Sequence, residues 1–108
     1  MRILSQDGMI DVPYEQCGFI VFFNELFSGN WDINANIGGN KAYKMAEYST
    51  EAKGRKAMEM LHDVYVAHEN YKKLDGYIQI EVSKREGIEK AIMYGGIFQF
   101  PSDDEVEV

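Results

Sequence analysis

Tyr43-Lys44-Met45-Ala46-Glu47-Tyr48-Ser49-Thr50-Glu51 is the stretch in which the hydrophobic rhythm of the chain changes. Before Ser49, apolar and polar residues alternate with the period of two that a half-buried strand requires. After it, apolar residues recur every three to four positions, as they do on one face of a helix. The sequence therefore predicts that a strand of a sheet ends and a helix begins at this point.

The predicted helix begins at Ser49, whose hydroxyl is suited to accept from an orphan amide of the first turn. It ends before Asp75-Gly76, because glycine commonly terminates helices. Gly54 is a helix-interior glycine and costs roughly 1 kcal/mol relative to alanine. The apolar face is expected to consist of Ala57, Met60, Leu61, Val64, Tyr65, His68 and Tyr71.

The pattern of short apolar runs separated by turn residues predicts the strands. They are expected over residues 2–6, 9–12, 18–23, 31–37, 41–48 and 97–100. Asp7-Gly8 is typical of a type I′ hairpin turn. The apolar run Gly18–Phe23 indicates a central strand covered on both faces, or a strand at an oligomer contact. For residues 77–96 the pattern does not decide between two assignments, a strand over 77–82 and a short helix over 88–94.

The alternation assigns residues to faces of the sheet. In the fourth strand it places Trp31, Ile33, Ala35 and Ile37 in the core, and Asp32, Asn34 and Asn36 in water. In the fifth it places Tyr43 and Met45 on one face and Lys44, Ala46 and Tyr48 on the other.

The fold class predicted from these patterns is α+β. An antiparallel sheet of about five strands carries one long amphipathic helix packed on one face. Residues 1–101 form a single domain, and residues 102–108 form a short acidic C-terminal tail in solvent.

Charge and composition exclude several classes of protein. The 108 residues carry 18 acidic and 11 basic side chains, for a net charge of −7, so nucleic acid is an unlikely partner. The apolar run Cys17–Phe27 is too short to span a membrane, and no basic region precedes it, so neither a membrane span nor a secretory signal is expected. Cys17 is the single cysteine, which precludes an internal disulfide and fits a reducing cytoplasm.

Motifs for catalysis or metal binding are incomplete in this sequence. Asp32-x-Asn34-x-Asn36 begins like a calcium-binding EF-hand loop, but the required sixth-position glycine is Ile37. Glu59 and His62 have the spacing of half a di-iron site, without the second helix that such a site needs. No nucleophile elbow, phosphate-binding loop or Cys-x-x-Cys occurs. We therefore expect no enzyme, no metal and no cofactor.

Three segments resemble a family of small proteins encoded by phages, prophages and mobile elements of Gram-positive bacteria. These are Met1-Arg2-Ile3-Leu4-Ser5-Gln6-Asp7-Gly8 with Asp11-Val12-Pro13-Tyr14-Glu15, Tyr48-Ser49-Thr50-Glu51-Ala52-Lys53 leading to Lys56-Ala57-Met58-Glu59-Met60-Leu61, and Phe98-Gln99-Phe100-Pro101-Ser102-Asp103-Asp104-Glu105. The resemblance covers both ends and the helix start. It implies an accessory protein in the cytoplasm of a host cell, and carries over no catalytic residues.

Two functional hypotheses follow. The first is a non-catalytic protein that binds a host or phage protein, with self-association into a homodimer also expected. Its interaction surface would include Phe27, Asn30, Tyr77 and Tyr94. The alternative is an oligomeric binder, or sponge, of a phosphate-bearing small molecule or nucleotide. Its anion contacts would be Arg2, Arg55, Lys56 and Arg85, with an aromatic ring stacked on a base.

Overall fold

The computed structural model of the protein describes residues 1–39, 41–73 and 96–108. The predicted α+β class is confirmed, because these residues form six strands, one α-helix and two short 3-10 helices. In chain order the elements are β1 (Arg2–Leu4), β2 (Asp11–Pro13), η1 (Tyr14–Gln16), β3 (Phe19–Asn24), β4 (Trp31–Gly38), β5 (Lys41–Tyr48), α1 (Glu51–Lys72), β6 (Ile97–Gln99) and η2 (Asp103–Glu105).

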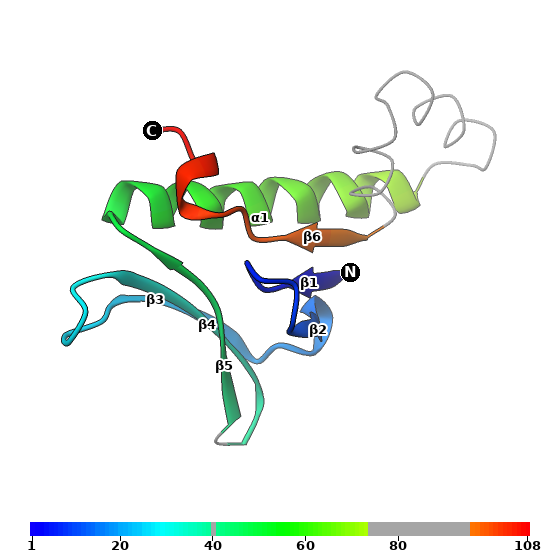
Figure 1. The fold of residues 1–108 in the computed structure, drawn as a ribbon. Coiled ribbons are helices and arrows are strands. Elements are labelled where there is room, and N and C mark those ends of the chain that lie inside the picture. Colours follow the sequence, from blue (N-terminus) through cyan, green and yellow to red (C-terminus); the bar gives the residue numbers. More distant parts are fainter. Residues whose placement is uncertain (40, 74–95) are drawn as a thin grey trace.

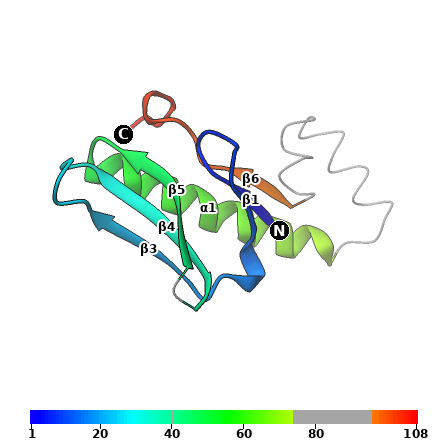
Figure 2. The same ribbon diagram turned by 60° about the horizontal axis from the view of Figure 1, so that its bottom comes forward.

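The strands form two sheets, where the pattern predicted one sheet of about five strands. Their orders are β2-β1-β6 and β3-β4-β5, and α1 runs across both (Figures 1 and 2). The sheets do not merge, because the outer edge of β5 bonds to the side chain and backbone of Gln6 and, within the described part of the chain, not to another strand. The core is one cluster shared by both sheets and the helix. It consists of Ile3, Val12, Ile33, Ala35, Met45, Ala46, Tyr48, Ala57, Leu61, Phe98, Phe100 and Val106.

The smaller sheet contains the predicted first hairpin, since β1 and β2 pair antiparallel. Its turn is not the expected type I′, which requires positive φ at both central residues. Gly8 has a φ of +74°, whereas Asp7 does not have a positive φ. β6 lies beside β1 in parallel, so this sheet is mixed and not purely antiparallel.

The larger sheet confirms the predicted core face of β4 at Ile33 and Ala35, which are fully buried. Asp32 was expected in water, but only 5% of its surface is exposed. The interpretation of Gly18–Phe23 as a covered central strand is wrong. β3 is the edge of the sheet and pairs only with β4 among the described residues.

A β-bulge changes which residues of β5 face the helix. Ile33 pairs with Ala46, but the next residue of β4 pairs with Lys44, so Met45 has no partner in the ladder. An extra residue reverses the alternation of side chains beyond it. Tyr43 therefore shares a face with Ala46 and Tyr48, and the faces predicted by simple alternation are wrong for this strand.

The helix begins one residue later than predicted. Thr50, not Ser49, is the N-cap, and its side chain accepts from the Lys53 amide. Ser49 is engaged elsewhere: its amide and its hydroxyl both donate to the Asp103 carboxylate, at 2.7 and 2.9 Å. The predicted apolar face is confirmed at Ala57, Leu61 and His68, which are all buried.

The C-terminal segment contacts the domain through Asp103 and Val106, so the expected solvated tail is not confirmed. Asp103 also pairs with Lys53 at 3.1 Å, and the Tyr48 hydroxyl donates to the Pro101 carbonyl at 2.7 Å. Val106 is only 5% exposed. The hydrogen bond from the Ser49 amide is the main reason why the pKa of Asp103 lies below its usual value.

We predict that Gln6→Ala lowers the free energy of unfolding by about 2 kcal/mol, because it removes three hydrogen bonds and leaves backbone groups of β5 unpaired. The side-chain amide of Gln6 donates to the backbone carbonyls of Glu47 and Pro101, and its oxygen accepts from the backbone N–H of Glu47. Urea denaturation measures the loss. Gln16→Ala is the matched control at an exposed glutamine, and equal stability of the two variants would contradict the assignment.

We predict that Gly54→Ala destabilises the protein by about 1 kcal/mol, although alanine is the better helix former. A Cβ on Gly54 would lie 2.7 Å from Cζ of Phe22 and closer still to Cε2. In a Phe22→Ala background the same substitution should become stabilising. A double-mutant cycle by urea denaturation tests this sign reversal, and a stabilising effect in the wild-type chain would contradict it.

Candidate functional site

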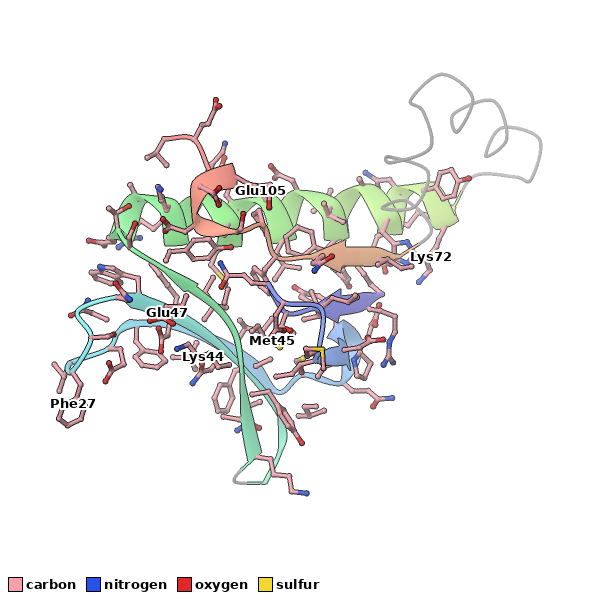
Figure 3. All side chains as sticks on the ribbon, in the orientation of Figure 1. Phe27, Lys44, Met45, Glu47, Lys72 and Glu105 are labelled. Carbon is pink, nitrogen blue, oxygen red and sulfur yellow. The ribbon has the colours of Figure 1, made fainter. Side chains whose placement is uncertain are left out.

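Exposed apolar side chains lie at two places on the hairpin of β3 and β4. In the turn between these strands, Phe27 is 100% and Leu26 90% exposed. Phe19 and Val21 on β3 are exposed by 58% and 38%. Figure 3 shows Phe27 projecting from the far end of the hairpin. Neighbouring apolar groups in water are unfavourable unless another surface covers them.

Hydrogen bonds within the turn residues 25–30, which we call the hairpin tip, fix its shape. The Glu25 carboxylate accepts from the amides of Phe27 and Ser28, at 3.1 and 2.7 Å. The side-chain amide of Asn24 donates to the backbone carbonyl of Gly29, whose φ of +76° favours glycine. The tip therefore holds Leu26 and Phe27 in place before any partner arrives, which reduces the entropy lost on binding.

A charged cluster lies behind the tip, on the face of the larger sheet that points away from α1. Lys44 Nζ is 2.8 Å from Glu47 Oε2 and 3.6 Å from Asp32 Oδ2, and Asn30 donates to Glu47 Oε1 at 2.7 Å. Lys44 and Glu47 are labelled in Figure 3. Asp32 Oδ1 is buried without a hydrogen-bond partner among the described residues. Burial therefore raises the pKa of Asp32 despite the nearby Lys44.

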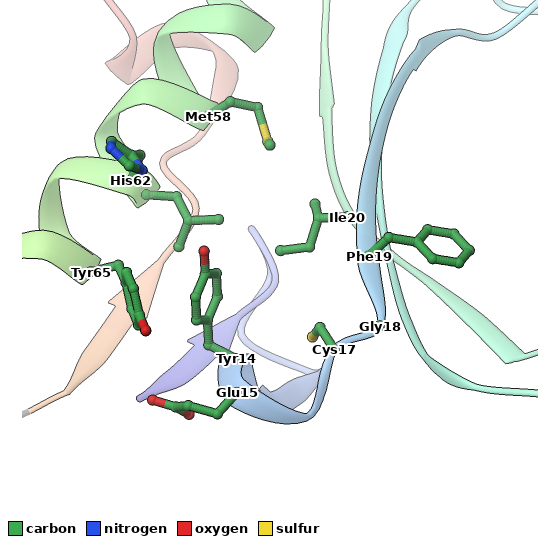
Figure 4. Close-up of a pocket in the computed structure, with 10 residues that line it drawn as sticks. Tyr14, Glu15, Cys17, Gly18, Phe19, Ile20, Met58, His62 and Tyr65 are labelled. Atoms are coloured by element: carbon green, nitrogen blue, oxygen red, sulfur yellow. The ribbon is translucent and has the colours of Figure 1, made fainter. Parts of the chain in front are cut away.

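A cleft of about 550 Å³ separates the start of β3 from the middle of α1 (Figure 4). It is lined by Tyr14, Glu15, Cys17, Gly18, Phe19, Ile20, Met58, Leu61, His62 and Tyr65. Ile20 and Met58 point into it, whereas the Phe19 ring points away. The rings of Tyr14 and Tyr65 close one side, with their centroids 4.6 Å apart.

The cleft does not assemble a nucleophile and base. Cys17 and His62 lie on opposite sides, with Tyr14 between them (Figure 4). The Cys17 thiol donates to the Pro13 carbonyl at 3.4 Å, and burial raises its pKa, which disfavours the reactive thiolate. Burial also raises the pKa of Tyr14, ahead of the contribution from Tyr65. These groups suit packing and recognition better than acid–base chemistry.

Glu15, His68 and Glu69 present ligand-capable atoms within 4.8 Å of one another. Both carboxylates are already paired with a positively charged amino group of the protein. Glu15 accepts from the Met1 amino group at 2.5 Å, which is the main cause of its lowered pKa. Glu69 pairs with Lys72 at 3.3 Å. We therefore assign no metal ion to this cluster.

Of the residues predicted to bind an anion, Arg2 and Arg55 are not brought together. The Arg2 amide donates to the Gly96 carbonyl, and Gly96 lies against His68 near the end of α1. Arg55 is in the first turns, about 20 Å away at the helical rise per residue. Arg2 and Arg55 pair with Asp11 and Glu51, at 2.8 and 2.6 Å.

Lys56 is exposed on the same helix, and Arg85 lies outside the described residues. Of the predicted interaction residues, Phe27 is fully exposed and Asn30 is bonded to Glu47. Tyr77 and Tyr94 lie outside the described residues. Sequence reasoning missed Leu26, whereas Phe19 and Val21 lie in the run Gly18–Phe23, for which one of its two alternatives was a strand at an oligomer contact. The signal for Leu26 was an apolar residue in a turn, whereas the exposure of β3 depends on its edge position.

We predict that Asp32→Asn raises the free energy of unfolding at pH 7 by about 1 kcal/mol, since it removes a buried charge with an unbonded oxygen. The pKa of Asp32 is higher in the folded than in the unfolded state. Ionisation of this acid therefore lowers the free energy of unfolding as the pH rises through the folded-state pKa, and has no effect below the unfolded-state pKa. The gain should shrink as the pH falls toward the unfolded pKa of 3.8 and vanish below it. Asp63→Asn, at an exposed acid, is the control, and a less stable Asp32→Asn at pH 7 would refute the reading.

Comparison of the chain with protein-family models, curated proteins and solved structures finds no significant match. Within residues 1–39, 41–73 and 96–108, no helix is long and apolar enough to cross a membrane.

Proposed function

We propose that this chain is a non-catalytic interaction protein that binds another protein through its hairpin tip. The observation that carries the proposal is the full exposure of Phe27 beside the 90% exposed Leu26, on a turn fixed by its own hydrogen bonds. A few anchor residues supply most of the binding energy of protein interfaces, and aromatic side chains such as phenylalanine are enriched at such interfaces. The cluster of Lys44, Glu47 and Asn30 behind the tip would form the polar rim.

The resemblance of the sequence segments supports a more specific setting. In that setting the protein is an accessory product of a phage or mobile element, works in the cytoplasm of a host cell, and takes a host or phage protein as its partner. The raised pKa of Cys17 and the separation of Cys17 from His62 support a non-catalytic role.

The alternative, a sponge for a phosphate-bearing ligand, has weaker support. Arg2 and Arg55 lie near opposite ends of α1 and are engaged by Asp11 and Glu51. The cleft beside α1 is large enough for a small molecule, but no lysine or arginine is among the described residues that line it.

The tip variant Leu26→Ser/Phe27→Ser is expected to lose its partner. Replacing an interface anchor costs about 2 kcal/mol or more, which corresponds to at least a 30-fold loss of affinity. The measurement is affinity capture of the tagged full chain from host cells, followed by quantitative mass spectrometry. A specific partner should be depleted with the tip variant relative to wild type.

Met9→Ser is the matched control, because Met9 is 82% exposed in a different loop. It should capture the same partner at the wild-type level. Equal recovery of every protein by wild type, tip variant and control would overturn the proposal.

A further inference from the structure

The outer edge of β3 lacks the features that normally protect an edge strand. It pairs with β4 on one side and with no strand of the described residues on the other. Natural edge strands are usually shortened, bulged, or marked by lysine, proline or inward charges. Phe19–Asn24 is six residues long and contains no charged residue and no proline. By contrast, Gln6 covers the edge of β5 at the other side of the same sheet.

The backbone of β3 is oriented for a further strand. The Glu25 backbone amide points across the hairpin and donates to the carbonyl of Asn30, the residue before β4, at 2.8 Å. Backbone groups alternate in direction along an antiparallel strand. The amides and carbonyls of Ile20, Phe22 and Asn24 therefore face the open edge, ready to form a ladder.

Charge restricts the surface on which a second copy of this chain can dock. The protein carries a net charge of −7, so two copies repel each other over most approaches. β3 is an uncharged strip, and an antiparallel arrangement places the two Glu25 side chains at opposite ends of it. Parallel pairing would bring these two acids together.

We propose that two copies pair antiparallel through β3, with Val21 opposite Val21 of the second copy. A two-fold axis perpendicular to the sheet keeps each face continuous. Odd-numbered residues of β3 therefore pair with odd-numbered residues of the second copy, and even-numbered with even-numbered. With Val21 at the axis, Phe19 lies opposite Phe23 and Ile20 opposite Phe22. A shift by one pair would place Phe19 against Glu25 and Ile20 against Asn24, which is less favourable.

This pairing explains both faces of the strand. On the outer face it covers Phe19 and Val21, which are 58% and 38% exposed in one chain. On the helix side it brings Phe22 of the second copy beside Ile20, at the mouth of the cleft under α1. The β3-β4-β5 sheets of the two copies become one continuous six-stranded sheet, with the α1 helices of both copies on the same face.

The first test is sedimentation equilibrium of the full chain. Wild type is expected to have the mass of two chains, and Val21→Glu should weaken association by at least about 100-fold, because two carboxylates would meet at the axis. Val66→Glu is the matched control: Val66 is an apolar residue of similar exposure, 43%, on α1. It should remain dimeric. Circular dichroism establishes that each variant is folded.

The second test uses disulfide cross-linking in a Cys17→Ser background, since Cys17 is the single cysteine. Val21→Cys should cross-link under mild oxidation, because directly opposite residues lie within the Cα separation that a disulfide spans. Phe19→Cys should not, because its two copies would be about 13 Å apart. Val66→Cys is a further negative control.

A monomeric wild type at about 100 μM, far above the dissociation constants of specific dimers, would overturn the proposal. So would a dimer in which Val21→Glu has no effect and Phe19→Cys cross-links as well as Val21→Cys. The pairing is independent of the hairpin tip, so Leu26→Ser/Phe27→Ser should dimerise normally. Loss of partner capture and loss of dimerisation are therefore separable results.

Discussion

The side-chain amide of Gln6 is the constraint on which the arrangement of the two sheets depends. It bonds to both backbone groups of Glu47 at the edge of β5 and to the carbonyl of Pro101, while its own backbone amide donates to Met45. One residue of the first hairpin thus closes the edge of the larger sheet and joins it to the C-terminal segment. Without that contact, backbone groups of β5 would need another partner.

Closure of one edge leaves the proposed interaction surfaces at the other. β5 is covered by Gln6, and the helix covers the face that carries Ile33 and Ala35. What stays exposed is the edge of β3, the outer face beside it, and the hairpin tip with Leu26 and Phe27. Strand pairing and anchor burial are the two usual ways in which such surfaces are satisfied.

Local pattern predicted the elements well where one physical rule decides the outcome. The β4 alternation, the first hairpin and the apolar face of α1 follow from periodicity, since each element must turn its apolar side to a core. Pattern failed where a distant contact competes. Ser49 is a good N-cap by composition, but Asp103 takes its amide and hydroxyl and Thr50 caps the helix. The bulge at Met45 reversed the faces of β5.

The sequence by itself determined the α+β class, the position of the helix and the candidate residue Phe27, because hydrophobic period and turn chemistry are local properties. Only the tertiary structure decided that β3 is an edge, that Arg2 and Arg55 lie apart, and that Asp32 is buried. These depend on which strands become neighbours. That choice is made by long-range contacts such as those of Gln6 and Asp103, and no short window of sequence contains both partners.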